Sequence, residues 1–297
     1  MALDIIRREL PVFSPSRTEV WLKCPLKMQL QYIEGLEPKY LRSRGARIGG
    51  SGFDAGVTLI HTHWAQEGTS TPAPEEIMSQ VRIVASEAIV GETEGYRVGG
   101  VEVETEDTLK AVKKSLEKYN AQTPLRGYTI KCIQKTFPDH GFCRIDLGVE
   151  KDGIPLVMDV KYKNTLSPDY FTKTVQRYFR SWQFLHYAWA YGEECGTPIT
   201  QAGLMLVIAK PYEAHVITQY LAKDWPQVWL ASARQAWSDM EDERVGLRLP
   251  RAAGDHEDQY GPCEMIEVCF EHGLDIANAL KGGYLIRPER EKHAPVA

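Results

Sequence analysis

The sequence predicts an α/β fold in which helices flank a mixed central β-sheet and further helices are added at both ends. Residues 128–163 alternate in polarity as strands do, and residues 202–221 contain a buried apolar run followed by a second strand-like run. The segments on either side have helical periodicity. We expect one domain over residues 1–297, with an N-terminal helical part at 14–125, a core at about 126–220 and a C-terminal helical part at 221–297.

The composition is typical of a soluble globular protein. The chain has 297 residues, of which 43% are hydrophobic and 25% are charged. Arg7, Arg8 and Glu9 interrupt the apolar opening, and no later segment resembles a membrane span, so we expect a cytoplasmic protein without membrane contact. A net charge of −5 argues against nucleic-acid binding through overall charge but leaves local basic patches open.

Helical periodicity precedes the predicted strands. The segment "SPSRTEVWLKCPLKMQLQY" reads as a helix that Cys24 and Pro25 interrupt. The glycine-rich "RIGGSGFDAG" is expected to precede another helix, whose apolar positions are Val57, Ile60 and Trp64. A further helix is expected over about residues 102–119.

Three consecutive strands are predicted in the central part of the chain: "YTIKCIQKTF", "GFCRIDLGVE" and "PLVMDVKYK". Asp152 and Gly153 lie between the last two and predict a tight turn. Farther on, "AGLMLVIAK" reads as a buried strand and "HVITQYL" as its antiparallel partner, followed by a helix over residues 222–241.

Residues 170–191 read as one helix with an apolar and a polar stripe. The apolar stripe is Val175, Tyr178, Trp182, Leu185 and Trp189. The polar stripe on the neighbouring face is Gln176, Arg180, Gln183 and Tyr187. The polar stripe directly follows the strand that carries the charged residues described next.

Asp159 and Lys161 lie two residues apart on a predicted strand, so their side chains emerge on the same face. If the two strands pair across the turn, Asp146 converges with Asp159, and two carboxylates are suited to bind Mg²⁺ or Mn²⁺. With a lysine beside the metal, this arrangement suits phosphodiester hydrolysis. The alternative is an ion pair on a half-exposed strand.

Together, "RIDLGV" and "LVMDVKYKN" resemble the core of the PD-(D/E)XK nuclease superfamily. "QFLHY" resembles the QxxxY helix motif of its RecB-like and CRISPR-adaptation exonuclease branch, and the Cys-Pro segment is similar to the entry helix of that branch. The resemblance implies a restriction-endonuclease-like core and a metal-dependent DNA nuclease of the exonuclease class. It also implies metal binding by Asp146, Asp159 and Val160, catalysis by Lys161, and positioning of the DNA or the lysine by Gln183 and Tyr187.

The sequence departs from the family pattern at two positions near this site. Asp54 stands where the family usually has a metal-binding histidine, and His61 and His63 follow as alternative ligands. Asp54 is therefore a candidate metal ligand, and the alternative is that it caps the following helix. Gln134 occupies a position where the family often has an acidic residue.

A third departure concerns the iron–sulfur cluster that many relatives hold with four cysteines. Cys24, Cys263 and Cys269 match three of these positions, and His256 is the nearest substitute for the fourth. An iron–sulfur cluster is therefore one prediction. The other is that these cysteines are buried in a terminal element that has lost its cluster.

Basic residues near the predicted site are expected to bind the DNA backbone. They are Arg177, Arg180 and Lys163. The resemblance implies DNA ends or single strands as the substrate, in recombination, repair or phage DNA processing in a bacterial or phage-infected cell. A recombination or single-strand-binding protein is a candidate partner. The alternative function is a non-catalytic DNA-end-binding or scaffold protein that retains the nuclease fold.

Overall fold

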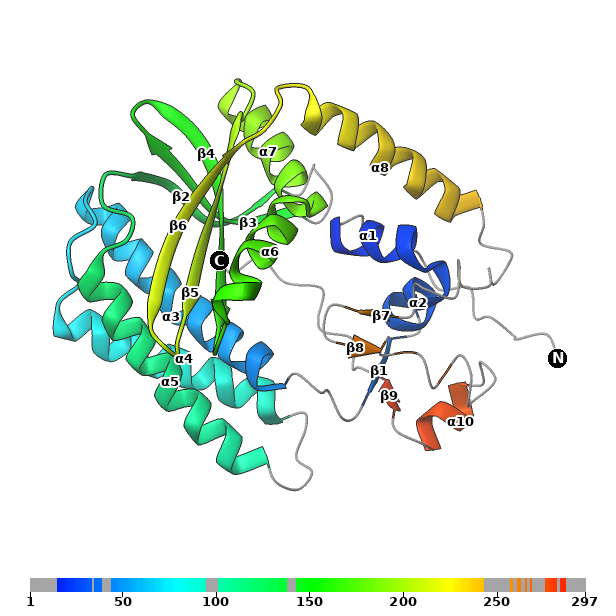
Figure 1. The fold of residues 1–297 in the computed structure, drawn as a ribbon, viewed down its shortest axis with the longest axis horizontal. Helices are drawn as coiled ribbons and strands as arrows, with labels where there is room; N and C mark the ends of the chain where they lie inside the picture. Colours follow the sequence, from blue (N-terminus) through cyan, green and yellow to red (C-terminus); the bar gives the residue numbers. More distant parts are fainter. Residues whose placement is uncertain are drawn as a thin grey trace. The chain divides into compact units, whose positions relative to one another are not determined.

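The computed structural model describes residues 15–33, 35–38, 44–94, 101–137, 143–242, 257–258, 261–262, 265, 268, 276–281 and 284–286. The chain forms two compact units (Figure 1). The larger unit is Ser43–Leu230, and the smaller unit combines Met1–Arg42 with Ala231–Ala297. Within the described residues, no helix has both the length and the apolar character needed to cross a bilayer.

A five-stranded mixed sheet forms the centre of the larger unit. Its order is β2-β3-β4-β5-β6, and only the β4–β5 pair is parallel. This confirms the predicted mixed sheet. The strands are β2 (Thr129–Phe137), β3 (Cys143–Lys151), β4 (Ile154–Lys163), β5 (Gln201–Ile208) and β6 (Glu213–Tyr220).

The turn between β3 and β4 lies where the sequence predicts it. Asp152 and Gly153 have φ angles of 52° and 78°, and two positive φ angles in succession match the twist of a two-residue hairpin. The parallel β4–β5 connection needs a longer crossover. Two helices provide it: α6 (Pro168–Phe179) and α7 (Trp182–Cys195).

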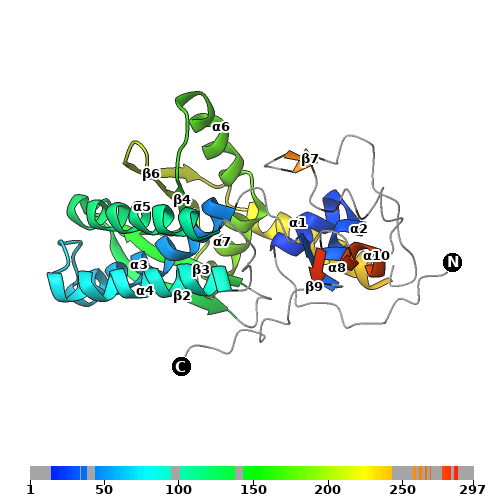
Figure 2. The ribbon, with the colours of Figure 1, turned by 90° about the horizontal axis from the view of Figure 1, so that it is seen from below.

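Helices pack on both faces of the sheet. Figures 1 and 2 show α3 (Arg44–Glu67), α4 (Glu75–Glu94) and α5 (Val101–Gln122) gathered along one face. Leu156 and Met158 of β4 join the core cluster beneath these helices, whereas Val157 joins the cluster beneath α7. Strand alternation thus divides β4 between two apolar cores.

The glycine-rich segment is part of α3, so the prediction that it precedes the helix is wrong. A Cβ at Gly52 would lie 2.5 Å from Cγ1 of Ile89 on α4, and one at Gly56 would lie 2.6 Å from Cδ1 of Leu116 on α5. These glycines therefore allow the three helices to pack closely. Asp54 lies inside α3, which excludes the alternative that it caps the helix.

The predicted single helix over residues 170–191 is also wrong, because the chain breaks it between α6 and α7. Ser181 has an extended backbone conformation, and its side chain accepts a hydrogen bond from the backbone N–H of Gln183. This is the geometry of a helix N-cap. Arg180 therefore lies in the connection, and only Gln183 and Tyr187 of the predicted polar stripe belong to α7.

The smaller unit joins segments from both ends of the chain. Its apolar cluster combines Leu26, Leu30 and Leu36 with Met265, Val268 and Ala279. The interruption at Cys24 and Pro25 is present, since one helix ends at Lys23 and the next begins at Pro25. The elements are α1 (Pro15–Lys23), α2 (Pro25–Met28), η1 (Gln29–Ile33), β1 (Leu36–Pro38), β7 (Glu257–Asp258), β8 (Gly261–Pro262), α10 (Ile276–Lys281) and β9 (Tyr284–Ile286). The boundary between the units falls within α8 (Trp225–Asp242).

Candidate active site

The sheet opens next to Asp146. Pairing between β3 and β4 runs from the hairpin turn to Leu147 and Met158 and ends there. Asp146 and Asp159 are the next residues of the two strands beyond this last pair. The pairing of β4 with β5 continues to Lys163, so β3 is the strand that leaves the ladder. The predicted convergence of the two acids therefore falls where β3 and β4 separate.

Two further irregularities coincide with Asp146. Cys143 and Ile145 pack in the cluster beneath α7, whereas Leu147 and Val149 pack in the cluster beneath α3. Alternate residues of a regular strand share one face, so β3 must twist sharply at Asp146. On the neighbouring strand, Gln134 has a φ of +46°, a conformation that costs energy for a residue other than glycine.

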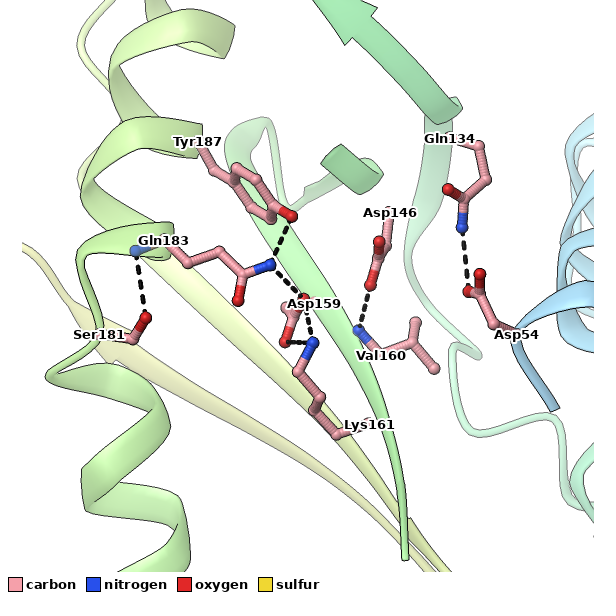
Figure 3. Close-up of polar contacts among 9 residues, drawn as sticks. All are labelled: Asp54, Gln134, Asp146, Asp159, Val160, Lys161, Ser181, Gln183 and Tyr187. Carbon is pink, nitrogen blue, oxygen red and sulfur yellow. Dashed lines mark hydrogen bonds and ion pairs between the residues drawn. The ribbon is translucent and has the colours of Figure 1, made fainter. Parts of the chain in front are cut away.

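The opening is stabilised by Asp146 itself. Its Oδ2 accepts a hydrogen bond of 2.9 Å from the backbone N–H of Val160, which has no strand partner on that side (Figure 3). A buried N–H requires such an acceptor. The contact fixes the Asp146 carboxylate beside Val160, the residue between Asp159 and Lys161.

Asp159 and Lys161 form a close ion pair on the face of β4 that turns towards α7 (Figure 3). Asp159 is fully buried, and Nζ of Lys161 lies 2.8 Å from its Oδ1 and 2.7 Å from its Oδ2. The Lys161 side chain remains 28% exposed. The predicted pairing on one face is therefore present, with a buried acid and a lysine that reaches solvent.

α7 adds an amide and a phenol to this pair. Nε2 of Gln183 donates to Oδ1 of Asp159 at 3.2 Å and to the hydroxyl oxygen of Tyr187 at 2.5 Å. Tyr187 is four residues farther along the helix, so both side chains project from the same face. The N-cap at Ser181 places this first turn of α7 against the site (Figure 3).

Asp54 reaches the same region from α3. Nε2 of Gln134 donates to its Oδ1 at 3.0 Å (Figure 3). Burial and nearby Asp146 together raise the pKa of Asp54 to about 6, against the opposing effects of Arg144, Lys161 and Gln134. Gln134 is thus the partner of Asp54, a role that its sequence position alone does not show. Arg144 is an additional exposed cation near the acids, and its place two strand residues before Asp146 is the signal that sequence reasoning missed.

Negative charge exceeds positive charge in the interior of this site. Burial and nearby Asp146 raise the pKa of Asp159 to about 7, although Lys161 opposes the shift. Burial lowers the pKa of Lys161, but Asp159 and Asp146 outweigh it, so the net shift is upward and the lysine keeps its proton. The ammonium group of Lys161 therefore interacts with more than one carboxylate.

The donor set fits a hard divalent cation. Oε1 of Gln134 is buried and has no hydrogen-bond partner among the described residues. Oδ2 of Asp159 is also buried, and apart from its ion pair with Lys161 it has no hydrogen-bond partner among these residues. Buried oxygens and crowded carboxylates both become more stable beside a cation. No group of three or more His, Cys, Asp or Glu side chains is gathered into a ready metal site among the described residues. The acids that fit are Asp54, Asp146 and Asp159.

The alternative histidine ligands do not join these acids. His61 is buried, its Nε2 lies 2.7 Å from the hydroxyl of Tyr119, and its ring packs near Trp64. Burial lowers the pKa of His61 to about 3, so it is a neutral core residue. His63 forms no hydrogen bond or ion pair within the part of the chain that the structure describes.

The predicted iron–sulfur ligands are only partly described. Cys24 is half-buried against the apolar cluster of the smaller unit, and its Sγ accepts a hydrogen bond of 3.4 Å from the backbone N–H of Lys27. Cys263, Cys269 and His256 lie outside the described residues. The cluster therefore stays a prediction.

Of the predicted DNA-binding residues, Lys163 lies on β4, Arg177 lies on α6 and Arg180 caps the C-terminus of α6. Nζ of Lys163 and Nζ of Lys161 lie 5.8 Å and 5.9 Å from the ring centroid of Tyr178. Arg177 and Arg180 are exposed at the end of α6. Tyr178, which the sequence placed on an apolar stripe, thus brings α6 into contact with both lysines of β4.

Comparison with protein-family models gives a match that covers most of the chain. The model of the PD-(D/E)XK nuclease superfamily matches residues 12–270. Among solved structures, the chain is similar to a candidate exonuclease from Eubacterium rectale, with 12% identity over 81% of this chain and 96% of that chain and a TM-score of 0.29. Curated proteins give no match. The superfamily match includes the strands and helices that carry every acid, lysine, amide and phenol of the site.

Proposed function

This chain belongs to the PD-(D/E)XK nuclease superfamily, and we propose that it is a divalent-metal-dependent deoxyribonuclease that acts as an exonuclease on DNA. The observation that carries the proposal is the buried Asp159, which is held by Lys161 and Gln183 where the strand of Asp146 separates from β4. Burying a carboxylate costs free energy, and buried carboxylates with strongly shifted pKa values are typical of functional sites.

The residues of the site have separate roles in the proposed reaction. Lys161 keeps its proton and extends to solvent, so its ammonium group can donate to a phosphate oxygen and stabilise the charge that develops there. Asp159 orients this ammonium group. Gln183 holds Asp159 and Tyr187 in place through its two hydrogen bonds.

The acids would hold the metal. Asp146 and Asp159, with Asp54 from α3, would bind Mg²⁺ or Mn²⁺, and the bound ion supplies a Lewis acid that polarises the phosphate and lowers the pKa of water. Gln134 keeps Asp54 turned towards these acids. Val160 contributes its N–H to Asp146, and this contact orients the acid for metal binding.

A nuclease assay with and without divalent metal tests the proposal. We expect cleavage of labelled DNA with Mg²⁺ or Mn²⁺ and none with EDTA. Asp159→Asn and Lys161→Ala should each lower the cleavage rate by about 10²- to 10³-fold, since each removes a group that acts on the reacting phosphate. DNA binding should change little, because most binding energy comes from backbone contacts elsewhere.

Lys151→Ala is a matched control, because Lys151 is exposed at the hairpin end of β3, away from the opening of the sheet. It should cleave at the wild-type rate. Cleavage at that rate by Lys161→Ala would contradict the mechanism. DNA-end binding without cleavage under any metal would contradict the enzyme and support the scaffold alternative. The RecB-like branch and the roles in recombination, repair or phage DNA processing stay predictions.

A further inference from the structure

α6 and its C-cap residue, Arg180, present an exposed stripe that combines one aromatic ring with three cations. At about 100° and 1.5 Å per helical residue, its members fall within about 80° of the helix circumference and span about 15 Å. The aromatic residue is Tyr170, which is 62% exposed. We call this the α6 stripe, and its exposed members are Tyr170, Lys173, Arg177 and Arg180.

The opposite side of α6 anchors the helix. Phe171, Val175, Tyr178 and Phe179 belong to or pack against the cluster beneath α7. The exposed stripe is therefore not a stretch of loosely held side chains. Its orientation is set by the apolar face that packs on the larger unit.

The charges of the stripe are not neutralised within the part of the chain that the structure describes. Lys173, Arg177 and Arg180 form no ion pair with a described residue, and Nζ of Lys173 lies 5.6 Å from the ring centroid of Tyr170. The sole acid of α6 is Asp169, in its first turn. Three cations and one acid give the helix an excess of positive charge, which favours binding of a polyanion.

The C-terminal end of α6 lies beside the candidate active site. Tyr178, on the packed face of the helix near that end, lies beneath both Lys161 and Lys163. One residue beyond Arg180 is Ser181, which caps the helix that carries Gln183. A strand that follows the α6 stripe towards this end of the helix would therefore arrive near Lys161.

We infer that the α6 stripe is a track for single-stranded DNA, with a base stacked on Tyr170 and phosphates bound by Lys173, Arg177 and Arg180. This inference rests on the proposed nuclease function and assigns to it a site on α6 that would select single strands. A ring offers a stacking face only to a base that is not already stacked inside a duplex. A length of about 15 Å covers about four nucleotides at about 3.4 Å each.

The test measures binding of a 12-nucleotide single strand that contains one 2-aminopurine, whose fluorescence responds to stacking, at several salt concentrations in EDTA. Tyr170→Ala should raise Kd by roughly 5- to 150-fold and abolish the fluorescence change, whereas Tyr170→Phe should retain both. Arg177→Ala with Arg180→Ala should reduce the slope of log Kd against log salt by about 1.4, about 0.7 for each phosphate contact.

Two matched controls lie elsewhere in the larger unit. Tyr220 is 79% exposed on β6, and Arg126 is exposed before β2, at the hairpin end of the sheet. Tyr220→Ala and Arg126→Ala should bind as the wild type does. Circular dichroism of each variant shows whether the fold is retained. If Tyr170→Ala is unstable, Tyr170→Leu, which keeps an apolar side chain without an aromatic face, should show the same loss of binding and of fluorescence change.

The outcomes separate the two proposals. Cleavage of single strands with an unchanged Kd and fluorescence response in Tyr170→Ala would overturn the track while leaving the nuclease intact. Equal binding of a blunt duplex and a single strand by the wild type would also overturn it. Tyr170-dependent binding without cleavage at any metal concentration would instead remove the nuclease proposal and retain the single-strand site.

Discussion

Asp54→Asn should make the folded protein more stable at alkaline pH. Asp54 is largely buried and lies close to Asp146, and its pKa is raised from 3.8 to about 6. The amide is nearly the same shape and can still accept the hydrogen bond from Gln134. The substitution therefore removes a charge that is costly to bury and little else.

The magnitude follows from proton linkage. The folded state binds the Asp54 proton more tightly than the unfolded state, so stability is lost as pH rises from about 4 through about 6. At pH 8 the ionised Asp54 costs about 3 kcal/mol, and at pH 4.5 it costs about 1 kcal/mol. Asp54→Asn should thus gain about 3 kcal/mol over the wild type at pH 8 and about 1 kcal/mol at pH 4.5.

Urea denaturation in EDTA, followed by tryptophan fluorescence at both pH values, measures this difference. Asp152→Asn in the exposed hairpin turn is the matched control, and its difference from the wild type should be the same at both pH values. Adding Mn²⁺ should stabilise the wild type more than Asp54→Asn, since a metal that binds the folded state raises its stability.

The reasoning is refuted if Asp54→Asn gains no more stability at pH 8 than at pH 4.5. An equal response of both proteins to Mn²⁺ would reject Asp54 as a metal ligand. These two measurements do not use cleavage, so they report on Asp54 even if no DNA substrate is found.

Three positions in α3 give further predictions about stability. In urea denaturation, Gly52→Ala should lower the free energy of unfolding by about 1 kcal/mol, because overpacking against Ile89 costs more than the gain in helix propensity. Gly50→Ala has no atom within 4 Å of the added Cβ, so it should raise the free energy of unfolding by about 1 kcal/mol. Equal effects of the two would contradict the close packing of α3 on α4. Burial lowers the pKa of His61 to about 3, so on acidification the unfolded wild type takes up this proton before the folded wild type does, and the folded state is destabilised. From pH 7 to pH 4, the free energy of unfolding should therefore fall by about 3 kcal/mol less in His61→Phe than in the wild type. The metal dependence of this variant should be unchanged, and a weaker Mn²⁺ response would return His61 to the candidate ligands.

The sequence by itself determined the hairpin and its charged residues. Strand alternation places Asp159 and Lys161 on one face, and the Asp152–Gly153 turn brings Asp146 close to Asp159. These features follow from local rules, since a two-residue turn and a period of two link residues close in the chain. The α/β fold and the mixed sheet follow from the same periodicities.

Only the tertiary structure decided how the site is completed. Gln134 and Asp54 are 80 residues apart in sequence, and their hydrogen bond depends on the packing of α3 on the sheet. The glycines of α3 looked like a loop because glycine lowers helix propensity, yet close contact with Ile89 and Leu116 requires them. Whether β3 leaves β4 at Asp146 likewise depends on neighbouring strands and helices, and such long-range contacts leave no periodic signal in the sequence.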